Sequence, residues 1–150
     1  MIKALASILL LTVLSSAAQK TDCPSRTVSK DARPHGANEV VEIDLGTVRK
    51  IHGQVIDPSG EPVDAVIEVY RYGKTAKEYE LYQISQVQKR QTACATDKDG
   101  KFCLAGLSSG SYVLVIGTRE PDGLNGVFAR VTINHEGEDK DLEIKLSLGT

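Results

Sequence analysis

Three cysteines, Cys23, Cys94 and Cys103, are the residues of this 150-residue chain with the most evident chemistry. In an oxidising compartment two of them can form a disulfide, and the odd count leaves one thiol over. Cys94 and Cys103 flank the turn sequence at 97–100. If that turn closes a hairpin, the two cysteines face each other on the outer side, at a separation that a disulfide spans. We predict a Cys94–Cys103 disulfide; a shift of one residue in the pairing would place them on opposite faces.

Cys23 would then be the remaining thiol, in a polar stretch without hydrophobic periodicity. It could form an intermolecular disulfide with a partner. The alternatives are a free thiol and a long-range bond to the folded part of the chain. The sequence leaves all three open.

Four of the five tyrosines fall within thirteen residues, at Tyr70, Tyr72, Tyr79 and Tyr82. A tyrosine ring combines apolar area with a polar tip, which suits sugar rings or protein contacts. These four are therefore the candidate ligand- or partner-binding residues. The alternative is that they pack a surface segment onto the fold. The absence of tryptophan weakens the case for a carbohydrate platform.

No residue pattern predicts a catalytic, metal or cofactor site. His35, His52 and His135 are far apart, with no carboxylate or cysteine at ligand spacing. The turn at 97–100 has the sequence Asp-x-Asp-Gly, which resembles part of a calcium loop, but the further oxygen ligands that such a loop needs are missing. We therefore expect no catalytic residues, no metal and no cofactor.

The N-terminus has the composition of a secretory signal peptide. One lysine precedes an apolar run, which ends in small residues, so residues 1–18 are expected to be removed by cleavage after Ala18. The run is too short to span a bilayer, which takes about 20 apolar residues. We expect a secreted or periplasmic protein without membrane insertion. Residues 19–38 are polar and are expected to form a flexible leader.

The net charge of −2 comes without a basic stripe or an arginine-rich arm. Nucleic-acid binding requires neutralisation of phosphates, so this class of partner is not expected. Electrostatic attachment to an anionic membrane is disfavoured for the same reason.

Apolar and polar residues alternate with the period of a β-strand through most of the chain. Seven strands are expected, near residues 51–56, 65–70, 93–95, 102–104, 112–116, 127–133 and 142–148. A further apolar patch at 40–45 is a strand or the lead-in to one. Strands with one apolar face bury it by stacking two sheets. We predict an all-β, single-domain, seven-stranded sandwich.

The stretch at 73–90 breaks this alternation. Leu81, Ile84 and Val87 recur at helical spacing among good helix formers. An excursion with a short helix is the first interpretation. A lengthened hairpin that runs directly into the strand at 93–95 is the alternative.

Three motifs occur in the order found in a known family. They are Gly53-x-Val55-x-Asp57-x-x-Gly60-x-Pro62, then Thr96-Asp97-x-x-Gly100-x-Phe102, then Gly110-x-Tyr112. In this the chain resembles the carboxypeptidase regulatory-like domain, a prealbumin-like (transthyretin-like) Greek-key β-sandwich. The resemblance implies such a domain over residues 39–150. Among the enzymes of the wider group, intradiol dioxygenases use a His-x-His spacing that this chain lacks.

Domains of this family are usually non-catalytic modules. The resemblance therefore implies an exported, non-enzymatic module for protein–protein or cell-envelope interactions, with an unidentified envelope protein as partner. The alternative is a glycan-binding module that uses the tyrosine-rich surface. Exposed edge strands could accept a partner strand through main-chain hydrogen bonds.

Overall fold

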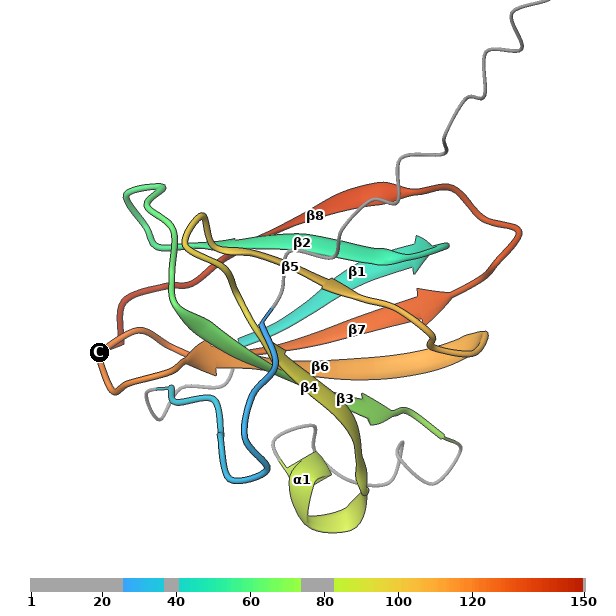
Figure 1. Ribbon diagram of the computed structural model, residues 1–150, viewed down its shortest axis with the longest axis horizontal. Coiled ribbons are helices and arrows are strands. Elements are labelled where there is room, and N and C mark those ends of the chain that lie inside the picture. The colour runs from blue at the N-terminus through green and yellow to red at the C-terminus, as the bar shows by residue number, and fades with distance from the viewer. Residues whose placement is uncertain (1–25, 37–40, 74–82, 150) are drawn as a thin grey trace, which may run out of the picture.

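The computed structural model describes residues 26–36, 41–73 and 83–149. These residues form a nearly all-β fold, which confirms the predicted fold class (Figure 1). Eight strands are described where seven were expected, since residues 41–45 of the predicted apolar patch belong to a full strand. The strands are β1 (Val41–Val48), β2 (Ile51–Ile56), β3 (Ala65–Arg71), β4 (Arg90–Ala95), β5 (Lys101–Leu104), β6 (Gly110–Thr118), β7 (Val127–Ile133) and β8 (Lys140–Lys145).

The strands form two sheets that stack as a sandwich. The larger sheet has the order β1-β7-β6-β3-β4, and the smaller has the order β5-β2-β8. β1 runs parallel to β7 and β2 runs parallel to β8, whereas the other neighbours are antiparallel. The smaller sheet therefore has one central strand and two edge strands.

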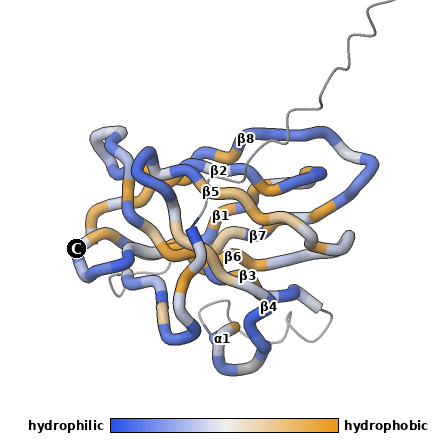
Figure 2. Tube along the Cα trace, in the orientation of Figure 1, coloured by the Kyte–Doolittle hydropathy of each residue, from blue (hydrophilic) through white to orange (hydrophobic). Residues whose placement is uncertain are grey.

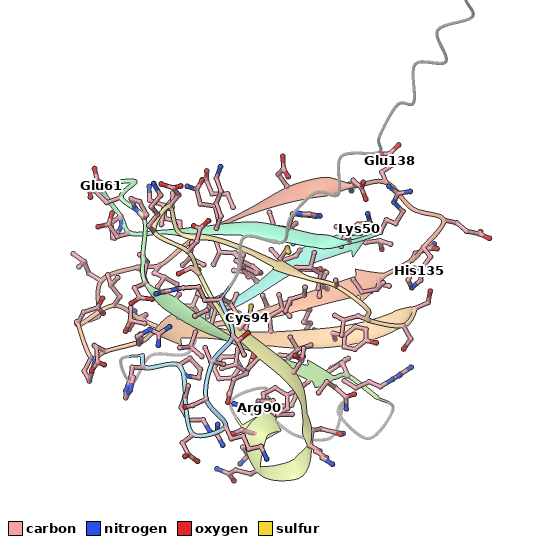
Figure 3. All side chains as sticks on the ribbon, in the orientation of Figure 1. Lys50, Glu61, Arg90, Cys94, His135 and Glu138 are labelled. Atoms are coloured by element: carbon pink, nitrogen blue, oxygen red, sulfur yellow. The ribbon has the colours of Figure 1, made fainter. Side chains whose placement is uncertain are left out.

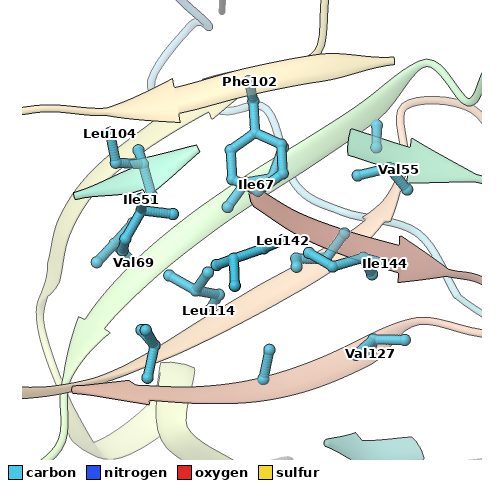
Figure 4. Close-up of a cluster of buried hydrophobic side chains, with 14 of the residues drawn as sticks. Ile51, Val55, Ile67, Val69, Phe102, Leu104, Leu114, Val127, Leu142 and Ile144 are labelled. Atoms are coloured by element: carbon cyan, nitrogen blue, oxygen red, sulfur yellow. The ribbon is translucent and has the colours of Figure 1, made fainter. Parts of the chain in front are cut away.

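The core lies between the two sheets and follows the alternation of the sequence. The inward side chains come from all eight strands and interdigitate as a close-packed layer (Figure 4). The loops that connect the strands are largely hydrophilic (Figure 2). The largest fully buried side chains include Phe102, Ile51, Ile67, Leu114, Ile116, Ile144 and Leu146.

The turn at 97–100 forms as predicted, but it does not close a hairpin between paired strands. Asp97 accepts the main-chain N–H groups of Asp99 and Lys101, both at 2.9 Å, and Gly100 takes a positive φ of 71°. Before the turn, the hydroxyl of the buried Thr96 bonds the main chain next to β3. The chain thus leaves the larger sheet with β4 and enters the smaller sheet with β5.

This crossing corrects the argument for a Cys94–Cys103 disulfide. β4 pairs with β3 and β5 pairs with β2, so the two cysteines are not cross-strand neighbours. Cys94 points into the core from the larger sheet, near the centre of Figure 3. Cys103 lies between the inward-facing Phe102 and Leu104, so its side chain faces away from the core. Cys103 is disulfide-bonded, and the geometry does not support Cys94 as its partner. Cys23 lies outside the described residues.

Residues 26–36, here called the strap, lie across the outer face of the larger sheet, where a flexible leader was expected at 19–38. Arg26 forms an isolated β-bridge with Ala95 at one edge, and His35 forms another with Thr118 of β6. All four main-chain bonds of these bridges measure 2.8–2.9 Å. The rest of the expected leader is outside the described residues.

The excursion contains one turn of helix, α1 (Ile84–Val87), beside the same face. This agrees with the helical interpretation for its second half, and residues 74–82 are outside the described part. Ile84 is fully buried against Tyr70 and Val113 on the outer side of the larger sheet. No helix in the described ranges has the length and apolar character to cross a membrane.

Candidate interaction site on the three-stranded sheet

The outer face of the smaller sheet carries polar side chains at its outward positions, apart from Cys103 and Ile56. The strand register places His52 of β2 between Cys103 of β5 and Asp141 of β8. One step along, Gln54 lies between Lys101 and Glu143. Because side chains alternate along each strand, these two rows face the same side of the sheet. The site is therefore a small polar platform built from three strands.

A hollow of about 480 Å³ lies over this platform. Its lining consists of His52, Gly53, Gln54, Lys101, Phe102, Asp141, Leu142 and Glu143. Gly53 faces the core, where a Cβ atom would collide with the Phe102 ring. Phe102 therefore fills the place of the missing side chain and packs directly against β2.

Charges are divided across the hollow. Asp141 and Glu143 stand on the β8 side and Lys101 stands on the β5 side, all of them exposed. The Gln54 amide between them donates a hydrogen bond of 2.9 Å to the Asp99 carbonyl oxygen, which holds it toward the turn. The platform thus presents a carboxylate side, a fixed amide and an ammonium side.

A bidentate ion pair fixes the loop that leads into β8. The Arg49 guanidinium donates to both carboxylate oxygens of Asp139, at 2.9 and 2.8 Å. These hydrogen bonds are the main reason why the pKa of Asp139 lies below its ordinary value, and the charges of Arg49, Lys50 and His52 lower it further. Both carboxylate oxygens of Asp139 are therefore engaged in holding this loop.

The free edge of β8 adjoins the platform. The Leu146 N–H donates to the Ile56 carbonyl at 2.9 Å, so even-numbered residues of β8 direct their main-chain groups toward β2. Since these groups alternate along a strand, those of Asp141, Glu143 and Lys145 point to the outer edge. Within the described residues no strand pairs with this edge between 140 and 145. Beyond it, the Ser147 carbonyl already accepts the Asn125 N–H at 2.8 Å.

The other three sheet edges differ from β8. The register of β1 is broken between Asp44 and Thr47 by a bulge with Gly46 at positive φ. The edge of β4 is met by the strap at Ala95. β5 is only four residues long. Bulges, covering segments and short strands are the usual ways to block an edge, so β8 is the longest straight edge left in the described part.

The structure describes two of the four candidate tyrosines, Tyr70 and Tyr72, and both belong to or pack against the apolar cluster around Ile84. Tyr70 is 3% exposed, and its hydroxyl donates to Glu68 at 3.0 Å. Burial, and then the charge of Glu68, raises the pKa of Tyr70 to about 12. Tyr72 is half-buried with Arg130 over its ring at 5.5 Å. Tyr70 thus has the packing role that was the alternative interpretation, and Tyr79 and Tyr82 lie outside the described residues.

Sequence reasoning missed a buried charge cluster around Glu68. This carboxylate is 2% exposed and contacts Arg90 at 3.2 Å and Arg33 of the strap at 3.5 Å. Arg90 also donates to strap carbonyls, at Ala32 and Lys30. A signal was present, because Val113, Val115 and Phe128 are apolar at outward positions of neighbouring strands. An apolar outer face indicates that something covers it.

A second hollow, of about 240 Å³, lies at one end of the sandwich, and four of its nine lining residues are acidic. Two of these are held by the fold. Asp64 pairs with Arg26 at 2.7 Å and with Arg119 at 3.2 Å. Asp57 accepts hydrogen bonds from Ser59 and Glu61, which lower its pKa. In the described ranges, no three His, Cys, Asp or Glu side chains converge as metal ligands.

Comparison with known proteins gives distant structural likenesses. No family model and no curated protein sequence matches the chain, so the resemblance to the carboxypeptidase regulatory-like domain stays a prediction. The backbone protein of the group B streptococcus pilus 2b is similar at 18% identity and a TM-score of 0.43, over 69% of this chain and 42% of its own.

Two dioxygenases show a similarly distant likeness. Catechol 1,2-dioxygenase from Pseudomonas arvilla C-1 matches at 11% identity and a TM-score of 0.39, over 82% of this chain and 62% of its own. 3-Chlorocatechol 1,2-dioxygenase from Rhodococcus opacus 1CP matches at 13% identity and a TM-score of 0.37, over 85% of this chain and 74% of its own. This chain spans about two-fifths of the pilus protein, and at these scores none of the three carries a functional argument.

Proposed function

We propose that the protein is an exported, non-catalytic β-sandwich module that binds a protein of the cell envelope or its surroundings. The observation that carries the proposal is the polar hollow over β2, β5 and β8, which continues into the free edge of β8. Concave polar surface next to an unpaired strand offers both side-chain and main-chain contacts to a partner. The N-terminal sequence at 1–18 supports a secreted or periplasmic location.

A photo-crosslinking residue at Gln54 tests this proposal. The protein is expressed in its own host with the crosslinker at Gln54, inside the hollow, or at Gln91, an exposed position on β4 of the other sheet. After illumination, crosslinked products are identified in envelope and medium fractions by mass spectrometry. We expect one defined partner from Gln54 and none from Gln91. Equal labelling from both positions, or none from either, would contradict the proposal.

A glycan is the second candidate ligand. The hollow contains an amide, an imidazole and two carboxylates, groups that hydrogen-bond sugar hydroxyls. With Tyr70 buried, a tyrosine-based platform would depend on Tyr79 and Tyr82. Affinity electrophoresis in gels containing host polysaccharide separates the two sites. Loss of retardation with Gln54→Ala would indicate glycan binding in the hollow. Loss with Tyr79→Ala and Tyr82→Ala would indicate binding by the tyrosines. If the parent protein is not retarded, the glycan hypothesis is wrong.

A further inference from the structure

We propose that β8 recognises its partner by strand addition, and that the added strand is a short extended segment with basic side chains at alternate positions. This inference rests on the proposed function and names the kind of partner that the site takes. Three features of β8 carry it: its unpaired main-chain groups, the charges next to them, and the obstacles to pairing with a second copy.

The main chain sets the length of the added strand. Asp141, Glu143 and Lys145 direct their N–H and C=O groups outward, as the register with β2 requires. At Ser147 the edge is already occupied by residues 123–125, through the Asn125 and Gly149 hydrogen bonds of 2.8 and 2.7 Å. The open window therefore accommodates about five residues of a partner strand.

The side chains set its charge. Residues directly opposite one another in paired strands have Cβ atoms about 4.5–5.5 Å apart, so the partner's outward side chains would lie beside Asp141 and Glu143. Both carboxylates are exposed, and neither forms an ion pair with another described residue. Lysine or arginine opposite them gives attraction, whereas acidic residues there give repulsion. Lys145 favours an acidic or neutral residue at the end of the partner segment.

A second copy of this chain meets at least one unfavourable contact in each antiparallel register. Pairing Asp141 with Lys145 of the copy gives two attractive pairs, but it brings Glu143 against Glu143. A shift in one direction places Asp141 opposite Glu143 twice. The opposite shift pairs Glu143 with Lys145, but it places Asp141 opposite Ser147, whose carbonyl is already bonded to Asn125. A strand with basic residues opposite both Asp141 and Glu143 avoids these unfavourable contacts, so it fits the edge better than a second copy does.

Two synthetic peptides provide the direct test. One alternates lysine with threonine and valine, and the other replaces each lysine by glutamate. Fluorescence anisotropy measures their binding to the mature protein at low salt and at physiological salt. We expect saturable binding of the lysine peptide that weakens as salt is added. The affinity of the glutamate peptide should be lower by a factor of about ten or more. The variant Glu143→Lys should reverse this preference.

A third peptide separates strand addition from simple charge attraction. It keeps every lysine but carries N-methyl groups on the main-chain nitrogens that would donate to β8. We expect its binding to fall about tenfold or more, because the ladder cannot form. In the protein, Glu143→Pro removes an outward N–H without touching the β2 ladder, and Glu143→Gln removes the charge alone. Glu143→Pro should bind less than Glu143→Gln, with circular dichroism as the control for folding.

The outcomes distinguish the two proposals. Equal binding of the N-methylated and parent lysine peptides would overturn strand addition, as would equal binding of the lysine and glutamate peptides. If the peptides fail while Gln54 still crosslinks a partner, the interaction module stands and strand addition does not. Concentration-dependent dimers that Glu143→Pro abolishes would show that a second copy, not a basic strand, occupies the edge.

Discussion

The two sheets of the sandwich use their outer faces in different ways. The outer face of the larger sheet is covered by the strap and α1, and beneath them lie a second apolar cluster and the buried Glu68. The outer face of the smaller sheet presents charged and amide side chains around a hollow. One outer face thus adds a packed layer to the fold, while the other leaves surface available for contact.

This difference shows how a small sandwich can gain stability without enlarging its central core. Tyr70, Ile84 and Val113 are buried outside the main layer, where each fully buried large side chain contributes about 1.5–3 kcal/mol. The charges of Glu68, Arg33 and Arg90 are tolerated there because they pair with one another. The smaller sheet has no such cover among the described residues, so its outer face can carry charges at little cost.

The sharpest test of the comparison removes one glutamate from each face. Glu68→Ala should lower the free energy of unfolding by about 3 kcal/mol, because it leaves the buried Tyr70 hydroxyl without its acceptor and the partly buried Arg90 without its ion pair. Glu143→Ala, on an exposed strand position, should change it by less than about 0.5 kcal/mol. Urea unfolding followed by circular dichroism measures both. Similar values for the two variants would show that the faces do not differ as described.

The disulfide of Cys103 is the next largest effect expected. Its side chain points away from the core on the smaller sheet, whereas Cys94 lies inside the core. We therefore expect non-reducing peptide mapping to join the Cys103 peptide to Cys23, the third cysteine of the sequence. Reduction should then cost about 2–4 kcal/mol of stability. A peptide pair that contains Cys94 and Cys103 would restore the original hairpin prediction.

A glycine under the strap tests whether the cover is packed tightly. A Cβ atom on Gly117 would collide with the main-chain carbonyl of His35. Gly117→Ala should therefore displace the strap at a cost of about 1–3 kcal/mol. Trypsin cleavage in the strap, at Lys30 or Arg33, should accelerate relative to the parent protein. Gly126→Ala is a milder variant beside the same strap, since its Cβ atom would meet the Ile116 carbonyl at 3.3 Å and Gly36 of the strap at 3.6 Å. Unchanged cleavage in Gly117→Ala would mean that the strap is held loosely.

The smallest effect concerns alkaline pH. Burial raises the pKa of Tyr70 to about 12 from the ordinary 10.0, so the folded state favours the neutral phenol. Its contribution to stability is fully present below pH 10 and is lost as the pH rises through the folded pKa. Ultraviolet absorbance should show one tyrosine that ionises late, absent in Tyr70→Phe. The parent protein should also lose more stability than Tyr70→Phe between pH 10 and about 12. Equal losses would place Tyr70 in a solvated site.

The strands were predictable because the alternation of apolar and polar residues indicates which side chains face the core. The turn at 97–100 was predictable too, since Asp97 and Gly100 have side-chain and backbone preferences that operate locally. The partner of each strand was not, because alternation says nothing about which sheet a strand joins. Thr96 lies where the chain leaves the larger sheet, and its hydroxyl bonds the main chain of Val63 and Ala65.

The candidate site was predictable only in part for the same reason. The polar positions of β2 and β8 were visible as outward residues of two strands separated by some ninety positions in the sequence. Their parallel pairing, which builds one platform and leaves one edge free, is a property of the sheet order. The role of Glu68 depends likewise on arginines that lie 22 residues after it and in the strap.

The position of the strap in the chain has a consequence for synthesis. Residues 26–36 leave the ribosome before the strands that they cover, and the hydrogen bonds of Arg26 reach residues 38 and 70 positions later. The strap is therefore synthesised before the strands of the larger sheet but can dock only after they have been made. Folding dominated by such distant pairings is slow. Until β6 has been made and the strap has docked, the nascent chain exposes the apolar outer face of its larger sheet. A chaperone would bind this face during that interval.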